Sequence, residues 1–220
     1  METNELLNRI NLSLAKIDKI IKSKVNSSRK KRKIKQILEL INRQFTTIAR
    51  VISSFNKLSY KKRIIDQVRP ICNKILDVIK ETLNCDSLAL EHIYLVRRIF
   101  DCGCIDAAEQ LVSLIMKKSD QDIDLLSMLA DITLEIGMID LVLKIFKKLK
   151  EEGLTCFEIE YNEALIKYMM GDCEESLNIL KNIHRKYNKK SSLGLKIALL
   201  IALGRISDAI KLAKIKVRKN

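Results

Sequence analysis

Six cysteines are the residues with the clearest chemical potential in this chain of 220 residues. The one close pair, Cys102-Gly103-Cys104, raises the question of a zinc site. Zinc needs about four convergent nitrogen or sulfur ligands, so Cys85 or His92 would have to complete the set. Most of the cysteines fall among apolar residues on predicted helices, where a free thiol packs as a small hydrophobe. We therefore expect buried thiols, no metal and no cofactor. The six are Cys72, Cys85, Cys102, Cys104, Cys156 and Cys173.

The other residue types that perform catalysis are sparse and scattered. The only histidines are His92 and His184, and neither accompanies a nucleophile in a familiar motif. Acidic residues are spread over predicted helix faces, which is typical of solvation rather than of acid–base work. A glycine-rich phosphate loop would have to follow a strand, and the sequence predicts no such strand. We therefore expect a protein without catalytic residues, which is not an enzyme.

The densest charged motif is the run from Arg29 to Lys35, which places six cations in seven residues. Because a helix here would be charged on every side, we expect a loop or a frayed helix start. The run is either a solvated linker or a site for nucleic acid, for an acidic protein or for nuclear import. We find no aromatic residues interleaved with the basic runs, which weakens base stacking as a mode of binding. The candidate residues are Arg29, Lys30, Lys31, Arg32, Lys33 and Lys35.

Charge divides the chain into two kinds of segment. The net charge is +14, yet residues 1–90 hold 20 Lys and Arg against 8 Asp and Glu, whereas residues 91–210 hold 16 against 19. This shift near residue 90 predicts a domain boundary. We expect a basic helical segment at residues 1–87 and a second region at residues 88–220.

The basic segment is helical by pattern. Apolar residues from Leu7 to Ile21 repeat at steps of three and four over about two heptads, which predicts a coiled coil or a helical-hairpin arm. Homo-oligomerisation through this N-terminal helix is one consequence. Apolar faces also predict helices over about 34–55 and 64–83, and Pro70 predicts a kink or a fresh helix start within the second.

The glycines carry a period in the second region. Gly103, Gly137, Gly171 and Gly204 are spaced 34, 34 and 33 residues apart, which is typical of stacked helical units. Each unit is interpreted as a helix, a glycine turn and a second helix, with the glycine at φ > 0. An acid or hydroxyl follows each glycine by three residues, near the predicted start of the second helix. The residue five positions after each glycine is small in most units, which allows the two helices of a unit to pack closely.

This pattern resembles the tetratricopeptide repeat. The segment Gly171-Asp172-Cys173-Glu174-Glu175-Ser176-Leu177 is similar to the turn signature of that family, and Tyr161, Asn162 and Tyr168 fall where the family favours such residues. The resemblance covers about residues 88–220 as four units and implies an α-solenoid. The run from Phe146 to Gly153, followed by Tyr161, is also similar to the RNA-binding pentatricopeptide repeat, whose spacing from tyrosine to turn glycine is one residue longer.

The resemblance also implies where a partner would bind. In tetratricopeptide arrays the first helices of the units line a concave groove, which suits a peptide or a helix. The alternative is that several of the implied groove residues only pack between units. The Lys and Asn residues with which the family clamps a terminal carboxylate are absent, so a chaperone-tail ligand is not expected. The implied groove residues are Arg97, Phe100, Asp131, Leu134, Tyr161, Leu165 and Tyr168.

Composition sets the remaining expectations. With 47% hydrophobic residues, one proline and six glycines, the chain is able to form a core but has few turn residues, which favours an all-α fold. No apolar stretch is long enough to span a membrane, and no apolar signal segment follows Met1, so we expect a cytoplasmic protein. Our main hypothesis is a scaffold that binds a protein or peptide through the groove. The alternative is a nucleic-acid-binding protein, with RNA favoured over DNA, that uses the basic segment.

Overall fold

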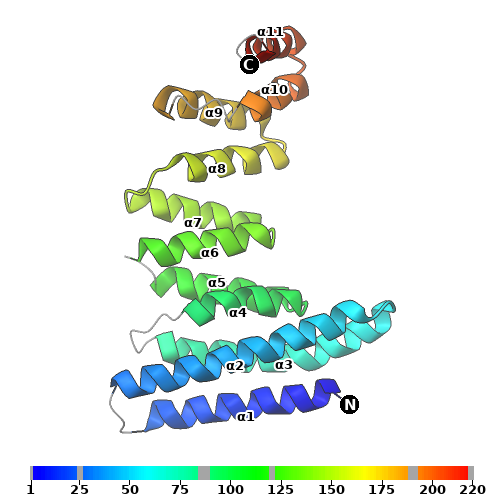
Figure 1. The fold of residues 1–220 in the computed structure, drawn as a ribbon, viewed down its shortest axis with the longest axis vertical. Coiled ribbons are helices and arrows are strands. Elements are labelled where there is room, and N and C mark those ends of the chain that lie inside the picture. Colours follow the sequence, from blue (N-terminus) through cyan, green and yellow to red (C-terminus); the bar gives the residue numbers. More distant parts are fainter. Residues whose placement is uncertain (1, 24–26, 84–89, 119–121, 188–192, 218–220) are drawn as a thin grey trace. The chain divides into compact units, whose positions relative to one another are not determined.

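The computed structural model describes residues 2–23, 27–83, 90–118, 122–187 and 193–217. These residues form eleven helices and contain no strand (Figure 1). The predicted all-α fold class is therefore confirmed. Cys85, one of the two residues that could complete a zinc site, lies outside the described residues.

The chain forms two compact units, Met1–Ile145 and Phe146–Asn220, which we describe separately. The first unit contains α1 (Glu2–Lys22), α2 (Ser27–Ser54), α3 (Leu58–Leu83), α4 (Leu90–Asp101), α5 (Ile105–Lys118), α6 (Ile123–Glu135) and the first half of α7 (Ile139–Glu151). The second contains the rest of α7 and α8 (Phe157–Met169), α9 (Cys173–Tyr187), α10 (Leu193–Ala202) and α11 (Ile206–Val217).

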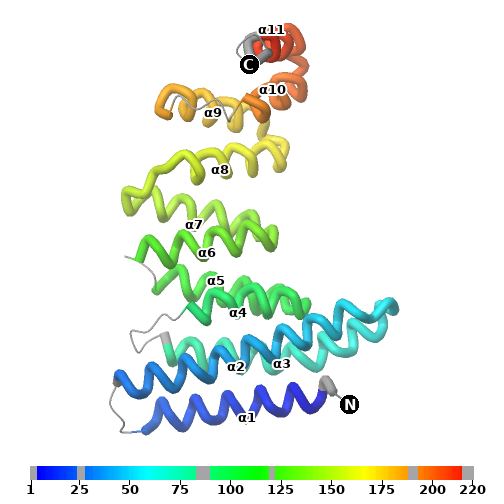
Figure 2. Tube along the Cα trace, in the orientation of Figure 1, coloured from blue at the N-terminus to red at the C-terminus, as the bar shows by residue number. Residues whose placement is uncertain are grey.

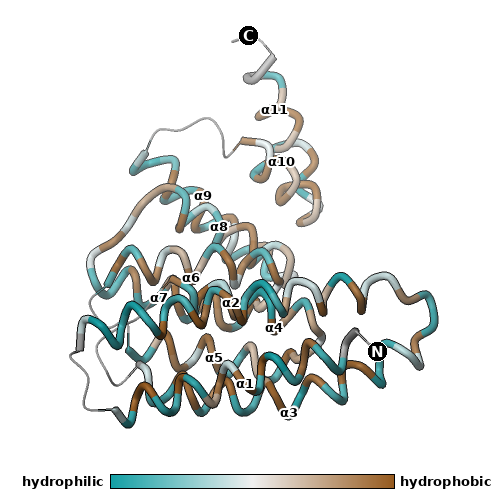
Figure 3. Tube along the Cα trace, turned by 60° about the horizontal axis from the view of Figure 1, so that its bottom comes forward, coloured by the Kyte–Doolittle hydropathy of each residue, from teal (hydrophilic) through white to brown (hydrophobic). Residues whose placement is uncertain are grey.

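The apolar stripe of α1 is buried within the chain. Leu7, Ile10, Leu14 and Ile17 are all buried where α1 packs against α2 and α3. Figure 3 shows the corresponding alternation of hydrophobic and hydrophilic positions along this helix. Because these four residues already have partners inside the unit, a homo-oligomer through α1 would have to use other side chains of the helix.

The basic run lies inside a helix rather than in a loop. α2 begins at Ser27, so Arg29 to Lys35 occupy its first turns, and the predicted loop is wrong. Ile34, Leu38 and Ile41 on the opposite face are buried against α1 and α4, which holds the helix together from its start. Packing of this apolar stripe therefore outweighs the crowding of like charges on the exposed face.

The next helix continues through its proline. α3 runs from Leu58 to Leu83 and includes Pro70, so of the two alternatives expected there the fresh helix start is wrong. Pro70 is exposed, and Val68 and Ile71 beside it are buried. The missing N–H removes one helical hydrogen bond. Burial of the apolar face on either side keeps the helix continuous.

The first unit joins the basic helices to the helices that follow them. α2 packs against α4 and α3 packs against α5, as the stacked traces in Figure 2 show. The residues on both sides of the predicted boundary at 87 therefore share one compact unit. The division into a basic segment and a separate region stays a prediction.

The four periodic glycines lie at equivalent turns. Each has a positive φ, between +70° and +88°, and follows a helix that ends two residues earlier. At Gly171, the glycine N–H donates to the carbonyl of Tyr168 (3.0 Å) and the next N–H donates to that of Lys167 (2.9 Å). The same two bonds recur at Gly103, Gly137 and Gly204, which defines a Schellman cap. The predicted helix, glycine turn and second helix are confirmed at all four positions.

The residue five positions after each of these glycines is buried. Ala108, Val142, Ser176 and Ala209 have at most 3% of their surface exposed. In the second unit, the Ser176 hydroxyl donates to the carbonyl of Ala164, which ties α9 to α8. A larger side chain here would separate the two helices. The core of this unit consists of Ala164, Leu177, Leu180, Ile183, Leu195, Leu199, Leu200 and Ala209.

The glycine cap yields a stability prediction with a matched control. Gly171→Ala places a Cβ in open space, so its only cost is the left-handed backbone (φ +88°). We expect a loss of about 1–2 kcal/mol in the free energy of unfolding. Gly194→Ala makes the same chemical change in open space within α10, at ordinary helical φ, and should raise stability by up to about 1 kcal/mol. Urea unfolding monitored by circular dichroism measures both, and equal effects at the two sites would contradict the cap.

Candidate functional site

Four of the implied groove residues lie on two neighbouring helices of the first unit. Arg97 and Phe100 are on α4, Asp131 and Leu134 are on α6, and the two helices are in contact. Asp131 is exposed and the other three are half-buried. We call these four residues the α4–α6 surface. Its mixture of an aromatic ring, a leucine and two charges is chemically suited to a peptide with both apolar and polar side chains.

Ion pairs hold part of this surface in place. The Arg97 guanidinium donates to Asp101 (Nε to Oδ1, 3.0 Å) and to Glu135 (Nη1 to Oε2, 3.0 Å), so it links α4 to the end of α6. Partial burial and the nearby Glu135 carboxylate raise the pKa of Asp131 above its usual value. Arg97 is therefore engaged inside the chain, whereas Asp131 is the exposed charge available to a partner.

The other three implied groove residues lie on α8 in the second unit. Tyr161, Leu165 and Tyr168 are half-buried and pack against the core of that unit. The predicted alternative of packing therefore holds for part of each side chain, while the rest remains exposed. Whether the residues of the two units form one groove stays a prediction.

Sequence reasoning missed an aromatic cluster at the start of α8. The Phe157 ring stacks on Tyr161 (5.5 Å between centroids) and meets Tyr187 edge to face (6.0 Å). The Lys186 ammonium lies 4.9 Å from the Tyr187 ring centroid and 2.8 Å from the Glu160 carboxylate, which raises the pKa of Lys186. The signal was the four-residue spacing of Phe157 and Tyr161, which places two rings on one helix face.

The basic start of α2 contains both engaged and unengaged cations. The Lys30 ammonium donates to the Ile21 carbonyl at the end of α1 (3.0 Å), and Lys35 pairs with Glu91 (3.5 Å). Lys31 also has an interaction. Arg29, Arg32 and Lys33 are exposed and form no ion pair with any described residue. These three are therefore the cations of the run that a polyanion would contact.

The position of these cations is electrostatically unfavourable in the protein alone. The first turns of a helix carry a partial positive charge, which stabilises anions and destabilises cations. The first turn of α2 contains no acidic residue, and cations begin at its third position. A bound anion would relieve this repulsion, because it would meet both the side-chain charges and the helix dipole.

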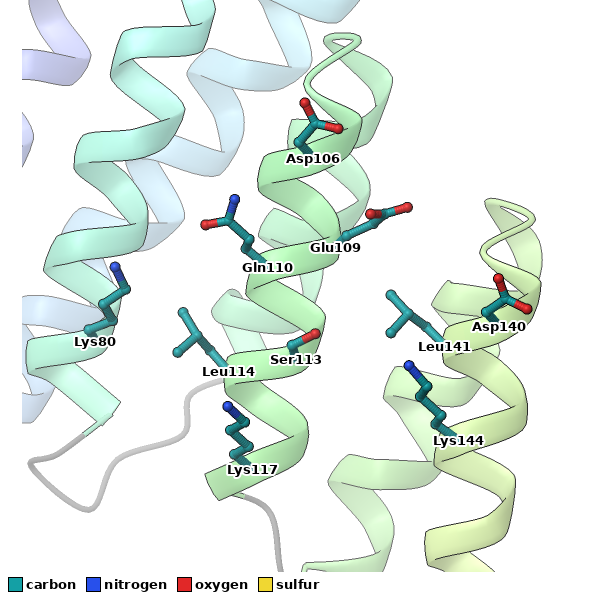
Figure 4. A pocket seen from close by; sticks show the side chains of 10 residues that line it. All are labelled: Lys80, Asp106, Glu109, Gln110, Ser113, Leu114, Lys117, Asp140, Leu141 and Lys144. Carbon is teal, nitrogen blue, oxygen red and sulfur yellow. The ribbon is translucent and has the colours of Figure 1, made fainter.

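A hollow of the first unit contains no arrangement of side chains typical of catalysis. It has a volume of about 580 Å³ and lies between α3, α5 and α7. Figure 4 shows Lys80 on the α3 side and Lys144 on the α7 side of α5. Acids line it near the starts of α5 and α7, and lysines line it farther along, as helix dipoles favour. It is lined by Lys80, Asp106, Glu109, Gln110, Ser113, Leu114, Lys117, Asp140, Leu141 and Lys144.

The described cysteines are free thiols. Cys72, Cys102 and Cys104 are buried, as predicted, whereas Cys156 and Cys173 are half-buried. A hydrogen bond with Cys104 and burial raise the pKa of Cys72, and burial raises that of Cys102. Cys72 and Cys102 are therefore held in the protonated form, in which a thiol is a poor nucleophile and a poor metal ligand, whereas the hydrogen bond with Cys72 lowers the pKa of Cys104. Within the described ranges, no three His, Cys, Asp or Glu residues are arranged to hold a metal ion.

His92 is buried beneath the surface of the first unit. It is 1% exposed, and its Nε2 lies 3.5 Å from the Thr82 hydroxyl, while its Nδ1 has no hydrogen-bond partner among the described residues. Burial lowers its pKa from 6.5 to about 4. The imidazole is therefore neutral at physiological pH and out of reach of a partner.

This histidine predicts how stability depends on pH. Because the folded pKa is lower than the unfolded pKa, the unfolded chain binds the proton first as the pH falls from 6.5 to 4. The protein should lose up to about 3 kcal/mol over that window and keep the full contribution above it. His92→Gln should remove this part of the slope, and His184→Gln, at an exposed position, should retain it. Urea unfolding at stepwise pH is the measurement, and parallel curves for wild type and His92→Gln would contradict the assignment.

Comparison with known proteins identifies no family for this chain, so a function has to be proposed from the structure. No protein-family model matches the chain, and no curated protein is significantly similar to it. Across the ranges that the structure covers, no helix has the length and apolar character needed to traverse a bilayer.

Proposed function

We propose that this protein is a non-enzymatic scaffold that binds a peptide or helix of another protein through a tetratricopeptide-like array. The observation that carries the proposal is the recurrence of one local geometry. Four helices end at residues spaced 34, 34 and 33 apart, and each is closed by the same glycine cap. Arrays of such units bind partners along their first helices, which here would be α4, α6, α8 and α10.

The α4–α6 surface is the part of the array best suited to a partner. It offers the half-buried side chains of Phe100 and Leu134 next to the exposed carboxylate of Asp131. Partly exposed apolar side chains gain from being covered, and a neighbouring charge selects the register of the partner. A helix or peptide with apolar residues and a nearby cation fits this chemistry.

The first test of the scaffold is site-specific crosslinking. A photoreactive benzoylphenylalanine at Leu134 on α6 should capture a protein partner from nuclease-treated lysate. The same residue at Leu114 on α5, which lines the hollow between α3, α5 and α7, is the matched control. Both leucines are half-buried in the first unit, so both variants perturb the fold similarly. Capture at Leu114 but not at Leu134 would place the partner on α5 instead of the α4–α6 surface and would contradict the proposal.

The captured partner then permits an affinity measurement. Asp131→Ala should weaken its binding by about fivefold or more, the scale of a contributing interface residue. Glu109→Ala, at an exposed acid of the hollow, should leave binding unchanged. Both changes should alter the free energy of unfolding by no more than about 0.5 kcal/mol. Equal binding by the two variants would contradict the proposed surface.

A second candidate function, nucleic-acid binding, is favoured by the unengaged cations at the start of α2. Replacing Arg29, Arg32 and Lys33 with serine removes three charges that form no ion pair in the described part of the chain. If they contact phosphates, affinity for duplex RNA should fall, and the slope of log K against log salt should decrease by about 0.9 per lost contact. Thermal melting should change little or rise slightly, because the cations oppose the helix dipole.

A charge-matched variant controls for net charge. Serine at Lys117, Lys118 and Lys144 removes the same three charges from exposed positions of α5 and α7. Its salt slope should match that of the wild type if the α2 cations form the site. Equal losses of RNA affinity in both variants would mean that only the net charge matters. If the wild type does not bind RNA at low salt, this candidate function is excluded.

A further inference from the structure

The α2–α3 hairpin carries an exposed tip that no function above uses. α2 ends at Ser54, α3 begins at Leu58, and the hairpin projects past α4 in the views of Figures 1 and 3. Ile52 and Ile64 are the last buried residues on its two arms. Beyond them, seven of the eight residues from Asn56 to Arg63 are exposed. We call residues 53–63 the hairpin tip.

The tip displays apolar and aromatic side chains in water. Leu58 is 79% exposed and Tyr60 is 51% exposed. The Tyr60 ring nevertheless stacks on Phe55, with 5.9 Å between centroids and 24° between planes. Phe55 therefore supports one side of the tyrosine ring, while half of the residue remains open to a further planar group.

The tip is also strongly basic. Lys57, Lys61, Lys62 and Arg63 flank residues 58–60 in the sequence, and no aspartate or glutamate occurs anywhere from residue 40 to 65. None of these four cations forms an ion pair with a described residue. These cations repel one another, and the nearest acid along the chain, Asp66, lies one helical turn after Lys62 on α3 without forming an ion pair with it, so an external anion would compensate most of the charge.

From this combination we infer that the hairpin tip is a binding site for single-stranded nucleic acid. Phosphates would meet the four cations, and a base would stack on the supported Tyr60 ring. Nonspecific single-strand sites combine these same two elements, a cationic track and aromatic platforms. A single strand is favoured over a duplex, because only an unpaired base offers its face to a protruding ring.

Other anionic partners would contact only some of the cations and aromatic rings of the hairpin tip. An acidic protein would pair with the lysines but leave the stacked rings without a planar partner. An anionic membrane would accept Leu58, Tyr60 and the lysines at its interface, and this is the alternative that the test must separate. The expectation that no aromatic residues accompany the basic runs is wrong here, because Tyr60 directly precedes Lys61 and its ring stacks on Phe55.

The inference goes beyond the scaffold function and shares only its ligand class with the second candidate function. The start of α2 and the tip lie at opposite ends of one helix of 28 residues, about 40 Å apart along its axis. The two surfaces can therefore fail separately. Serine at Arg29, Arg32 and Lys33 tests the first, and changes at the tip test the second.

The experiment measures fluorescence anisotropy of the full chain with an oligouridylate of about 12 nucleotides, at several salt concentrations. The second probe is an abasic sugar–phosphate strand of equal length, which retains the charges and lacks the bases. Tyr60→Ala should weaken oligouridylate binding about tenfold and leave abasic binding unchanged, because it removes only stacking. Tyr60→Phe, which keeps the ring, should bind like the wild type.

Lys61→Ser with Lys62→Ser should weaken both probes alike and decrease the salt slope by about 1.4, or 0.7 per single-strand phosphate contact. Circular dichroism melting should change little, since Lys62 is exposed, Lys61 is half-buried and neither belongs to the core. If Tyr60→Ala affects both probes equally or neither, the stacking site is overturned. If phosphatidylserine vesicles bind more tightly than oligouridylate and Leu58→Ser abolishes that binding, the tip is a membrane contact instead.

Discussion

The left-handed glycine cap is the constraint on which the helical pairs depend. A helix that ends in this conformation reverses the chain within two residues, and its last carbonyls stay hydrogen-bonded. The next helix then begins at a fixed point, which is why an acid or hydroxyl stands at the second position of α5, α7, α9 and α11. At α8 and α9, the same geometry brings Ser176, the fifth residue after Gly171, against the preceding helix. The burial of the residue at this position at all four turns, and its mostly small size, are consistent with the cap.

Within the described residues, surface charges are paired in one part of the first unit and unpaired in another. On α4 and α6, arginines meet acids within the protein, as Arg97 does with Asp101 and Glu135. On α2 and at the hairpin tip, cations such as Arg32 and Lys62 meet none among the residues described. Paired surface charges fix local geometry at little net gain. Unpaired clusters cost the free protein repulsion, so they are the better indicators of a charged partner.

The sequence predicted what local periodicity controls and missed what tertiary packing decides. The spacing of Gly171 and its three equivalents predicted helix ends and positive φ, because a cap is set by a few neighbouring residues. The charge pattern of Arg29 to Lys35 predicted a loop or a frayed helix start, and the loop was wrong because local repulsion was considered without the burial of Ile34 and Leu38. The stacking of Phe55 on Tyr60 was missed as well, because it requires the turn that brings α3 back along α2. The residues of the α4–α6 surface were predicted from the repeat register. That register does not reveal that Arg97 forms ion pairs with Asp101 and Glu135.

In the first unit, folding and the proposed recognition depend on different residues. Its helices are held mainly by buried aliphatic stripes, so the surface charges that form no ion pair among the described residues would be available for recognition. Where the surface mixes exposed Asp131 with half-buried Phe100, a partner would gain from apolar burial, and the one charge would select its register. Where unpaired cations accompany a supported aromatic ring, a polyanion with planar groups would gain from both elements. The two surfaces demand different partner chemistry, and salt distinguishes them, because only phosphate binding depends on the release of condensed counterions.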